Sequence, residues 1–222
     1  MRLLVLGGNG RTGVHLVDEA LARGHRVSAL VRHPPTLPVR KGLDVIQGTP
    51  QRLEDVDKAF RLEGQAVPDA VVVTLNPSRT SDSPFARPVA PPRFMADSIA
   101  NAITVMKQHN VPKLVVMQAL GVGDSYSSMS LWMRWARHWT YMKHAYDDHD
   151  LVDEVVKSSS VNYVLARPPW LTYGKPRPVR TFGNTGDGIG NLATISRQSV
   201  ADFLLDACER SDWDRSTPVI AS

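Results

Sequence analysis

Hydrophobic positions along the chain follow two alternating patterns. Short apolar runs occur at residues 3–6, 26–31, 43–47, 69–75, 113–117 and 161–166, and such runs are typical of parallel strands buried on both faces. The segments near 14–21, 53–62, 92–109, 143–158 and 196–209 are expected to be helices, as at 92–109, where apolar residues recur at helical spacing. This alternation predicts an α/β fold of the Rossmann type, a doubly wound parallel sheet with helices on both faces. A short last strand is expected at 218–221.

The first apolar run breaks directly into glycines, in the stretch Gly7-Gly8-Asn9-Gly10-Arg11-Thr12-Gly13. Gly7 permits a sharp turn, Gly10 leaves room for a pyrophosphate beside the backbone, and Gly13 lets the helix pack close to the strand. Free N–H groups at the start of the helix would face the anion. A dinucleotide cradle is therefore predicted, with an ordinary glycine-rich turn as the alternative; its binding residues would be Gly7, Gly10, Arg11, Thr12 and Gly13.

Arg32 stands at the carboxyl end of the second expected strand, where dinucleotide folds meet the adenosine ribose. An acidic residue at this position holds the 2′-hydroxyl of NAD, whereas an arginine suits the 2′-phosphate of NADP. Arg11 supplies a second positive group. The pattern predicts NADP(H) as the cofactor; the alternative is that Arg32 is an ordinary surface residue.

The other expected strands also end beside the crevice. Thr49 follows the third strand, near the adenine, where contacts would be made mostly by backbone. The nicotinamide would be bordered by residues after the fourth, fifth and sixth strands, namely Asn76, Gln118, Pro168, Pro169, Trp170 and Leu171.

Length and composition limit the remaining possibilities. The 222 residues suit one NAD(P)-binding domain, with a small substrate-binding part formed by about 77–92, 125–141 and 171–195, called here the accessory segments. The net charge of +4 fits an anionic cofactor or substrate, but the basic residues are scattered, so no nucleic-acid partner is predicted. No run approaches the ~18 apolar residues that span a bilayer, no signal peptide is recognisable, and Cys208 is the only cysteine. We therefore expect a cytoplasmic monomer or homodimer with a small-molecule substrate and no membrane partner.

Three tryptophans lie within eight residues, Trp132, Trp135 and Trp139. They are predicted to form an aromatic substrate pocket together with Trp170, and the alternatives are a subunit interface or a local hydrophobic patch. The Pro- and Ser-rich segment 77–92 is either a mobile lid or simple decoration.

The helix expected at 143–158 is rich in histidine and aspartate. His144 and His149 are five positions apart and share a helix face poorly, so no metal site is predicted.

Several of these motifs together resemble those of the atypical short-chain dehydrogenase/reductases. They are the glycine stretch, Leu30-Val31-Arg32, Asp55-Val56-Asp57-Lys58, Asp69-Ala70-Val71-Val72-Val73 and Arg167-Pro168-Pro169. The flavin reductase/biliverdin-IXβ reductase group is the nearest branch, because residues 147–163 are similar to its corresponding stretch, and NmrA-like proteins are broader relatives. The resemblance implies the Rossmann fold and an NAD(P) cofactor, and it is much less specific for the reaction.

The wider superfamily uses a serine and a Tyr-x-x-x-Lys pair, and this chain departs from that pattern. Counting back from the sixth strand, the tyrosine position falls on Ala145, the lysine position on His149 and the serine position near Gln118-Ala119. His149 is therefore the candidate catalytic residue, for ribose contact or proton supply; alternatively it is a structural histidine facing Asp148 or Asp153.

Together these features predict an NADPH-dependent oxidoreductase that transfers hydride to an aromatic or conjugated acceptor of the flavin, quinone or tetrapyrrole kind. The alternatives are a non-catalytic NAD(P)-binding sensor and a redox-neutral isomerase or dehydratase.

Overall fold

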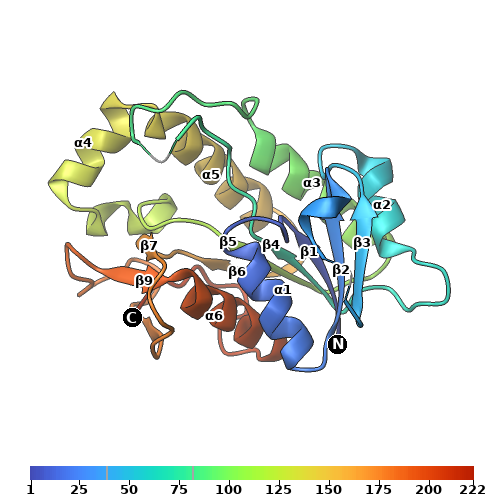
Figure 1. The fold of residues 1–222 in the computed structure, drawn as a ribbon. Coiled ribbons are helices and arrows are strands. Elements are labelled where there is room, and N and C mark those ends of the chain that lie inside the picture. Colours follow the sequence, from blue (N-terminus) through green and yellow to red (C-terminus); the bar gives the residue numbers. More distant parts are fainter. Residues whose placement is uncertain (39, 82) are drawn as a thin grey trace.

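The computed structural model describes residues 1–38, 40–81 and 83–222 and is built on a six-stranded parallel sheet (Figure 1). The strand order is β3-β2-β1-β4-β5-β6, so the order reverses between β1 and β4. The strands are β1 (Arg2–Leu6), β2 (Arg26–Val31), β3 (Leu43–Gln47), β4 (Ala70–Val73), β5 (Lys113–Met117) and β6 (Asn162–Ala166). The predicted Rossmann-type fold is thereby confirmed.

The central strands are buried on both faces. Every residue of β1, β4 and β5 is buried, which explains why these strands read as continuous apolar runs. Each neighbouring pair of strands is parallel and in continuous register, with Leu6 opposite Leu30 on one side and Val73 on the other. The carboxyl ends of β1, β2 and β4 consequently meet at one edge of the sheet.

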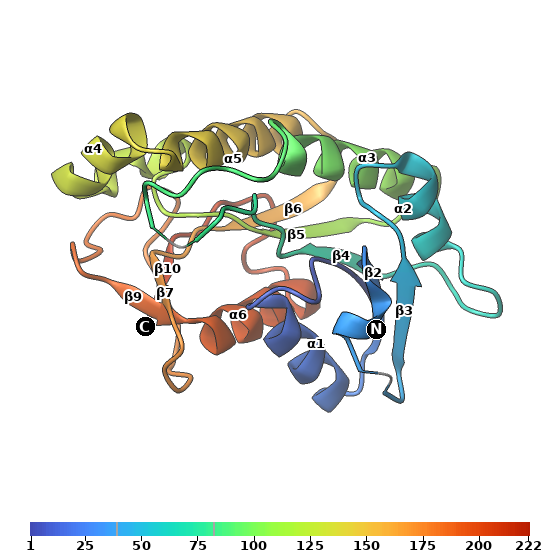
Figure 2. The same cartoon turned by 45° about the horizontal axis from the view of Figure 1, so that its top comes forward.

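Two layers of helices cover the sheet, as Figure 2 shows. Helices α1 (Gly13–Ala22) and α6 (Arg197–Glu209) contribute to the core on one face, and α2 (Leu53–Phe60), α3 (Phe94–Gln108) and α5 (Met142–Lys157) to the core on the other. Ser196 caps α6, because its hydroxyl accepts a hydrogen bond from the backbone N–H of Ser199. Among the described residues, no helix combines the length and the apolar character needed to cross a bilayer.

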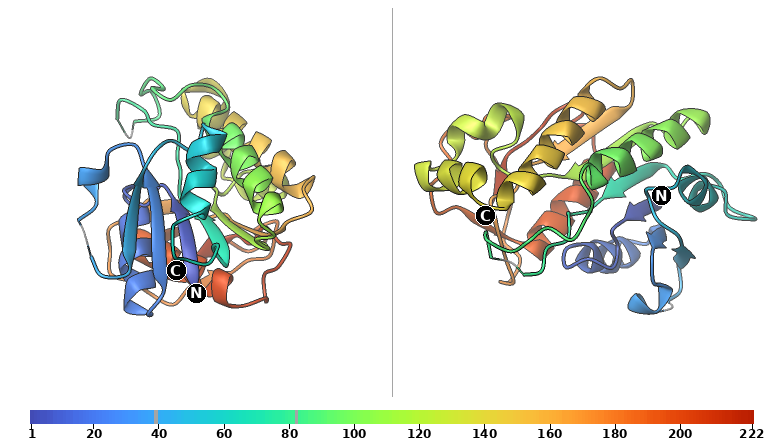
Figure 3. Two further views of the ribbon diagram at one scale, coloured as in Figure 1. Left: turned by 90° about the vertical axis from the view of Figure 1, so that its right-hand side faces the viewer. Right: turned by 90° about the horizontal axis from the view of Figure 1, so that it is seen from above.

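The accessory segments add smaller elements at the end of the molecule away from β2 and β3 (Figures 1 and 3). They include a 3-10 helix, η2 (Gly123–Ser128), helix α4 (Leu131–Trp139) and strands of two small sheets. Another 3-10 helix, η1 (Pro34–Thr36), follows β2. In the sheets, β7 (Trp170–Thr172) pairs in parallel with β9 (Thr194–Ser196), and β8 (Arg180–Thr181) pairs antiparallel with β10 (Ile220–Ala221). A separate apolar cluster, centred on Val122, Met129 and Tyr146, lies beneath α4.

The beginning of α3 is fixed by a residue of α5. The carboxylate of Asp148 accepts hydrogen bonds from the backbone N–H groups of Met95, at 2.8 Å, and Ala96, at 3.0 Å. These donors have no partner inside their own helix, and a negative charge at a helix N-terminus is favourable. The accessory segment 77–92, which leads into α3, is thus anchored at its far end to α5.

Candidate functional site

The glycine turn after β1 has the backbone geometry that a close approach to an anion requires. Gly7 adopts a φ of +91°, which side chains of L residues disfavour, and a β-carbon there would lie 3.0 Å from the backbone nitrogen of Leu75. A β-carbon on Gly13 would overlap the carbonyl oxygen of Gly7. The first turn of α1 therefore sits directly against the end of β1, and the residue types at both positions are dictated by sterics.

A long cavity of about 490 Å³ opens at the carboxyl ends of β1, β2 and β4. Most of the residues predicted to bind the cofactor line it: Gly7, Gly10, Arg11, Thr12, Arg32, Asn76 and Leu171. Gly13 lies directly behind this wall. Thr49 does not line the cavity, because its backbone N–H is turned to the carboxylate of Asp55 (2.9 Å), and Pro50 and Gln51 line the cavity in its place.

A second, largely apolar cavity of about 290 Å³ adjoins the first. Pro168, Pro169 and Trp170 after β6 form part of its wall, as predicted for the end of the crevice. The remaining wall comes from the accessory segments, α5 and the loop after β5, including Leu120, Met129, Met133, Met142 and Tyr146. Such an arrangement, apolar walls beside a cofactor crevice, is typical of a pocket for an apolar small molecule.

Both cavities are lined by the same five residues where they meet, Arg11, Asn76, Arg79, Leu171 and Arg197. Arg32 adds a fourth guanidinium to the longer cavity. Among the described residues that line either cavity there is no aspartate or glutamate. The described lining of the two cavities is thus rich in guanidinium groups, which suit anionic ligands.

Tyr146 directly follows Ala145, the residue that counting back from the sixth strand assigns to the tyrosine position of the superfamily. Ala145 lines a different hollow together with His144, whereas Tyr146 lines the apolar cavity. Its hydroxyl donates a hydrogen bond to the carbonyl oxygen of Leu120 (3.1 Å), and burial raises the pKa of Tyr146 to about 12. The cavity thus contains a phenol that holds its proton strongly.

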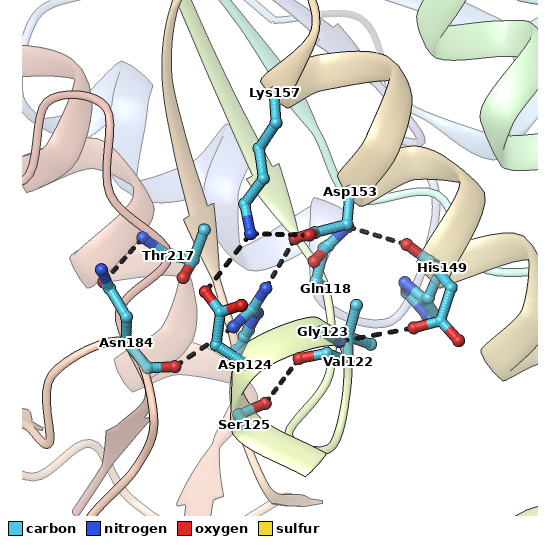
Figure 4. Close-up of polar contacts among 12 residues, drawn as sticks. Gln118, Val122, Gly123, Asp124, Ser125, His149, Asp153, Lys157, Asn184 and Thr217 are labelled. Carbon is cyan, nitrogen blue, oxygen red and sulfur yellow. Dashed lines mark hydrogen bonds and ion pairs between the residues drawn. The ribbon is translucent and has the colours of Figure 1, made fainter.

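His149 and Gln118 lie behind the cavity wall, and this corrects their expected placement. Both are buried and neither lines either cavity, while the Gln118 amide donates to the backbone carbonyl of His149 at 3.1 Å (Figure 4). Burial, with a smaller contribution from the Arg137 cation, lowers the pKa of His149 to about 4, so its imidazole is neutral at pH 7. His149 therefore does not line the cavities where a ribose and an acceptor are expected.

The two carboxylates expected as alternative partners of His149 are also engaged elsewhere. Asp148 caps α3, and Asp153 forms ion pairs with Arg167 at 2.6 Å and Lys157 at 2.8 Å (Figure 4). Within the described part of the chain, Nδ1 of His149 has no hydrogen-bond partner. His149 is a buried neutral histidine of the layer behind the cavity.

The tryptophans of α4 lie outside both cavities, which corrects the prediction that they wall a substrate pocket. Trp132 and Trp135 stack on each other at 5.7 Å between ring centroids, and Trp139 is 75% exposed. The inward face of α4 is made by smaller side chains, since Ala136 is buried and Met133 reaches the apolar cavity. Trp170 alone of the predicted aromatic set lines the cavity.

Arg79, Tyr146 and Arg197 are among the cavity residues that had not been singled out from the sequence. Arg79 lies in a loop and Arg197 at a helix start, each with a common residue type and no motif around it. The available signal was topological. Arg79 comes shortly after β4, which ends at the crevice, and Arg197 directly follows β9.

Solved structures share this fold over the full length of the chain. ChuY, an anaerobillin reductase from Escherichia coli O157:H7, superimposes with a TM-score of 0.77 at 17% identity, over 100% of this chain and 97% of ChuY. A Bacillus halodurans protein described as an NAD-dependent epimerase/dehydratase gives 0.74 at 20% identity, covering 100% and 94%. A Veillonella parvula short-chain dehydrogenase/reductase in complex with NADP gives 0.75 at 15% identity, also covering 100% and 94%. At these identities the likeness shows the fold alone.

The family is shown by a separate comparison, which uses sequence. A family model described as NAD(P)H-binding matches residues 7–211, from the glycine turn to just beyond α6. The matched range contains all the described residues that line the two cavities, from Gly7 to Arg197. The chain therefore belongs to the NAD(P)H-binding family, and it has the Rossmann fold.

Proposed function

We propose that this protein is an NADPH-dependent oxidoreductase that reduces an aromatic or conjugated acceptor of the flavin, quinone or tetrapyrrole kind. The observation that carries the proposal is the junction of two cavities. The longer one runs along the glycine turn and Arg32, and the apolar one continues it past Asn76 and Leu171. Two ligands bound in these cavities would meet at that junction, as hydride transfer requires.

The residues of the longer cavity fit the cofactor. The turn leaves no room for a side chain at Gly7 or Gly13 and offers the N–H groups at the start of α1 to a pyrophosphate. Arg32, exposed at the end of β2, would bind the 2′-phosphate that distinguishes NADPH from NADH. When bound, NADPH supplies a hydride, and with one proton from water the acceptor gains two hydrogens and NADP⁺ is released.

The apolar cavity favours acceptors that need no acid during the hydride step. Its only described phenol, Tyr146, has a pKa of about 12 and donates its proton to the Leu120 carbonyl, so it is a weak acid toward a ligand. A simple ketone develops a localised alkoxide and needs a strong donor, whereas a conjugated acceptor spreads the charge over its rings. The structure of anaerobillin reductase shares this fold, which is consistent with a conjugated substrate.

The test is turnover of the purified protein with NADPH and a panel of flavins, quinones and simple ketones, followed by the absorbance of the reduced nicotinamide. We expect oxidation of NADPH with conjugated acceptors and little with ketones. The matched variant is Ala193→Phe, which would fill the apolar cavity from β9's flank while leaving the glycine turn untouched. It should bind NADPH as the wild type does and lose turnover.

Two results would contradict the proposal. Efficient ketone turnover would mean that a donor other than a weakly acidic Tyr146 supplies the proton. Failure of every acceptor to oxidise NADPH, with the cofactor still bound, would favour a sensor or a redox-neutral isomerase or dehydratase.

A further inference from the structure

We propose that the end of the molecule formed by α4 and segment 171–195 docks on a lipid bilayer that carries acidic headgroups. The starting observation is the outward face of α4, which is apolar and exposed. No membrane partner was expected from the sequence, because no run of residues can span a bilayer. A helix that lies in the surface of a bilayer needs no such run.

Four apolar side chains that are between 46% and 81% exposed form one stripe along α4: Leu131, Trp132, Trp135 and Trp139. Because successive residues of a helix turn by about 100°, these positions fall within an arc of roughly 100°. The buried Ala136 and the cavity-lining Met133 fall outside that arc. A surface helix normally carries polar residues on its outward face, whereas tryptophan favours the boundary between lipid and water.

The apolar cavity reaches the surface at the same end of the molecule (Figures 1 and 3). Ser130 and Ala193 line the cavity, and their neighbours Leu131 and Leu192 are 81% and 90% exposed. Trp170 lines the cavity and is itself half exposed. Apolar side chains thus flank the cavity from two segments. An acceptor dissolved in the bilayer would enter here, a step that rests on the proposed function, whereas the docking itself does not.

The charge of this end suits an acidic surface. Segments 125–141 and 171–195 hold five lysines or arginines and one acidic residue, Asp187, so together they carry +4, as much as the whole chain. The five cations are Arg134, Arg137, Lys175, Arg177 and Arg180. Arg137 pairs with Asp150 of α5, whereas the other four form no ion pair with the described residues. Each such cation strengthens binding to acidic headgroups.

The same charge disfavours a second copy of this chain as the occupant. Two copies related by a two-fold axis would bring the same face of each together, so that like charges would lie opposite one another. A bilayer with acidic lipids offers an apolar boundary to the stripe on α4 and negative charge to the lysines and arginines.

Sedimentation with vesicles tests the docking in the absence of cofactor and acceptor. We would compare vesicles of phosphatidylcholine alone with vesicles of phosphatidylcholine and phosphatidylglycerol in equal parts. The partition coefficient to the acidic vesicles should be higher by about tenfold or more. The double variant Trp132→Ser/Trp139→Ser should lower it about tenfold, because two large apolar side chains no longer enter the interface.

Two matched pairs of variants control for general effects of substitution. Lys175→Ser should weaken binding to acidic vesicles about fivefold, whereas Lys41→Ser, an exposed lysine before β3, should leave it unchanged. Leu131→Ser should weaken binding, whereas Leu53→Ser, which alters the exposed first residue of α2, should not. All these variants should bind NADPH as the wild type does, which shows that they are folded.

Fluorescence locates the contact, because brominated phosphatidylcholine quenches tryptophans that lie within the bilayer. The wild type should be quenched, and the double variant should lose most of the quenching. Binding to neither kind of vesicle, equal binding to both, or quenching that the double variant retains would overturn the proposal. So would a dimer that depends on Trp132 and Trp139 and binds no vesicles, because a second copy would then be the occupant.

Failure of the docking can be distinguished from failure of the proposed reduction. Vesicle binding by a protein that oxidises NADPH with no acceptor would leave the docking surface standing and reject the reduction. Oxidation of NADPH with a soluble acceptor, without vesicle binding, would do the reverse.

Discussion

The two ends of the crevice differ in how they are built. At the cofactor end, the glycine turn and Arg32 come from a single β-α-β unit of about thirty residues, residues 2–32. At the acceptor end, the wall apart from Arg11 is assembled from segments spread between Asn76 and Arg197. The comparison shows that a site made by local backbone geometry can be predicted from sequence, whereas one assembled by long-range packing follows the tertiary structure.

Replacing Gly13 by alanine should have the largest effect, because it would disrupt the backbone structure of the cofactor end. The new β-carbon would overlap the carbonyl oxygen of Gly7, so α1 must move away from β1. We expect a loss of about 3 kcal/mol or more in the free energy of unfolding, with loss of NADPH binding, measured by denaturation and titration. Gly174→Ala is the control at the acceptor end, where the nearest atom is 3.7 Å away, and it should change stability by less than about 0.5 kcal/mol. Similar losses in both variants would refute the contrast.

The buried layer behind the acceptor end should show itself in the pH dependence of stability. His149 has a pKa of about 4 when folded, below its ordinary 6.5, so only the unfolded chain takes up this proton between these values. Stability should therefore fall by about 3 kcal/mol as the pH drops from 6.5 to 4, and stay level above 6.5. The measurement is denaturant unfolding of wild type and His149→Gln across this range. A variant that loses as much stability as the wild type would show that His149 is protonated in the folded state.

Arg32→Ala tests whether the cofactor end distinguishes NADPH from NADH. Removing a charge-assisted bond to the 2′-phosphate should weaken NADPH binding by about 10- to 100-fold, or roughly 1.5–3 kcal/mol, and leave NADH binding unchanged. Lys41→Ala removes an exposed positive charge that lines neither cavity and should alter neither affinity. Equal dissociation constants of the wild type for NADH and NADPH would contradict the role of Arg32.

The tryptophans distinguish the cavity wall from the surface beside it. Trp170 lines the apolar cavity, so Trp170→Ala should raise the KM for the acceptor about fivefold, the equivalent of ~1 kcal/mol. Trp139→Ser should change KM by less than about twofold, because Trp139 is 75% exposed and lines neither cavity. Steady-state kinetics with one conjugated acceptor checks both. An equal effect of the two substitutions would place α4 in the binding site.

The limits of sequence reasoning have physical causes at particular residues. The bounds of β2, β3 and β5 were predicted to the residue, since apolar runs between turns leave few alternatives. On a helix each residue turns by about 100°, so the neighbours Ala145 and Tyr146 line different cavities, and only the structure shows that Tyr146 lines the apolar one. For α4, the cluster of tryptophans suggested a substrate pocket, but it is Met133 that packs against the cluster of Met129 and Tyr146, and Ala136 that is buried.

The fully buried Arg167 helps to hold the longest accessory segment, residues 171–195, called here the excursion. Its Nη1 donates to the carbonyl oxygen of Asn184 at 3.1 Å, and the Asn184 side chain accepts from the backbone N–H of Thr217 at 2.9 Å (Figure 4). The excursion 171–195 is thereby fastened to the body of the protein at its middle. Because closure entropy depends on the length of each free segment, the excursion behaves as two short loops. Proteases should accordingly cut near Leu192 or Lys175, which are exposed, and leave the hydrogen-bonded region around Asn184 intact.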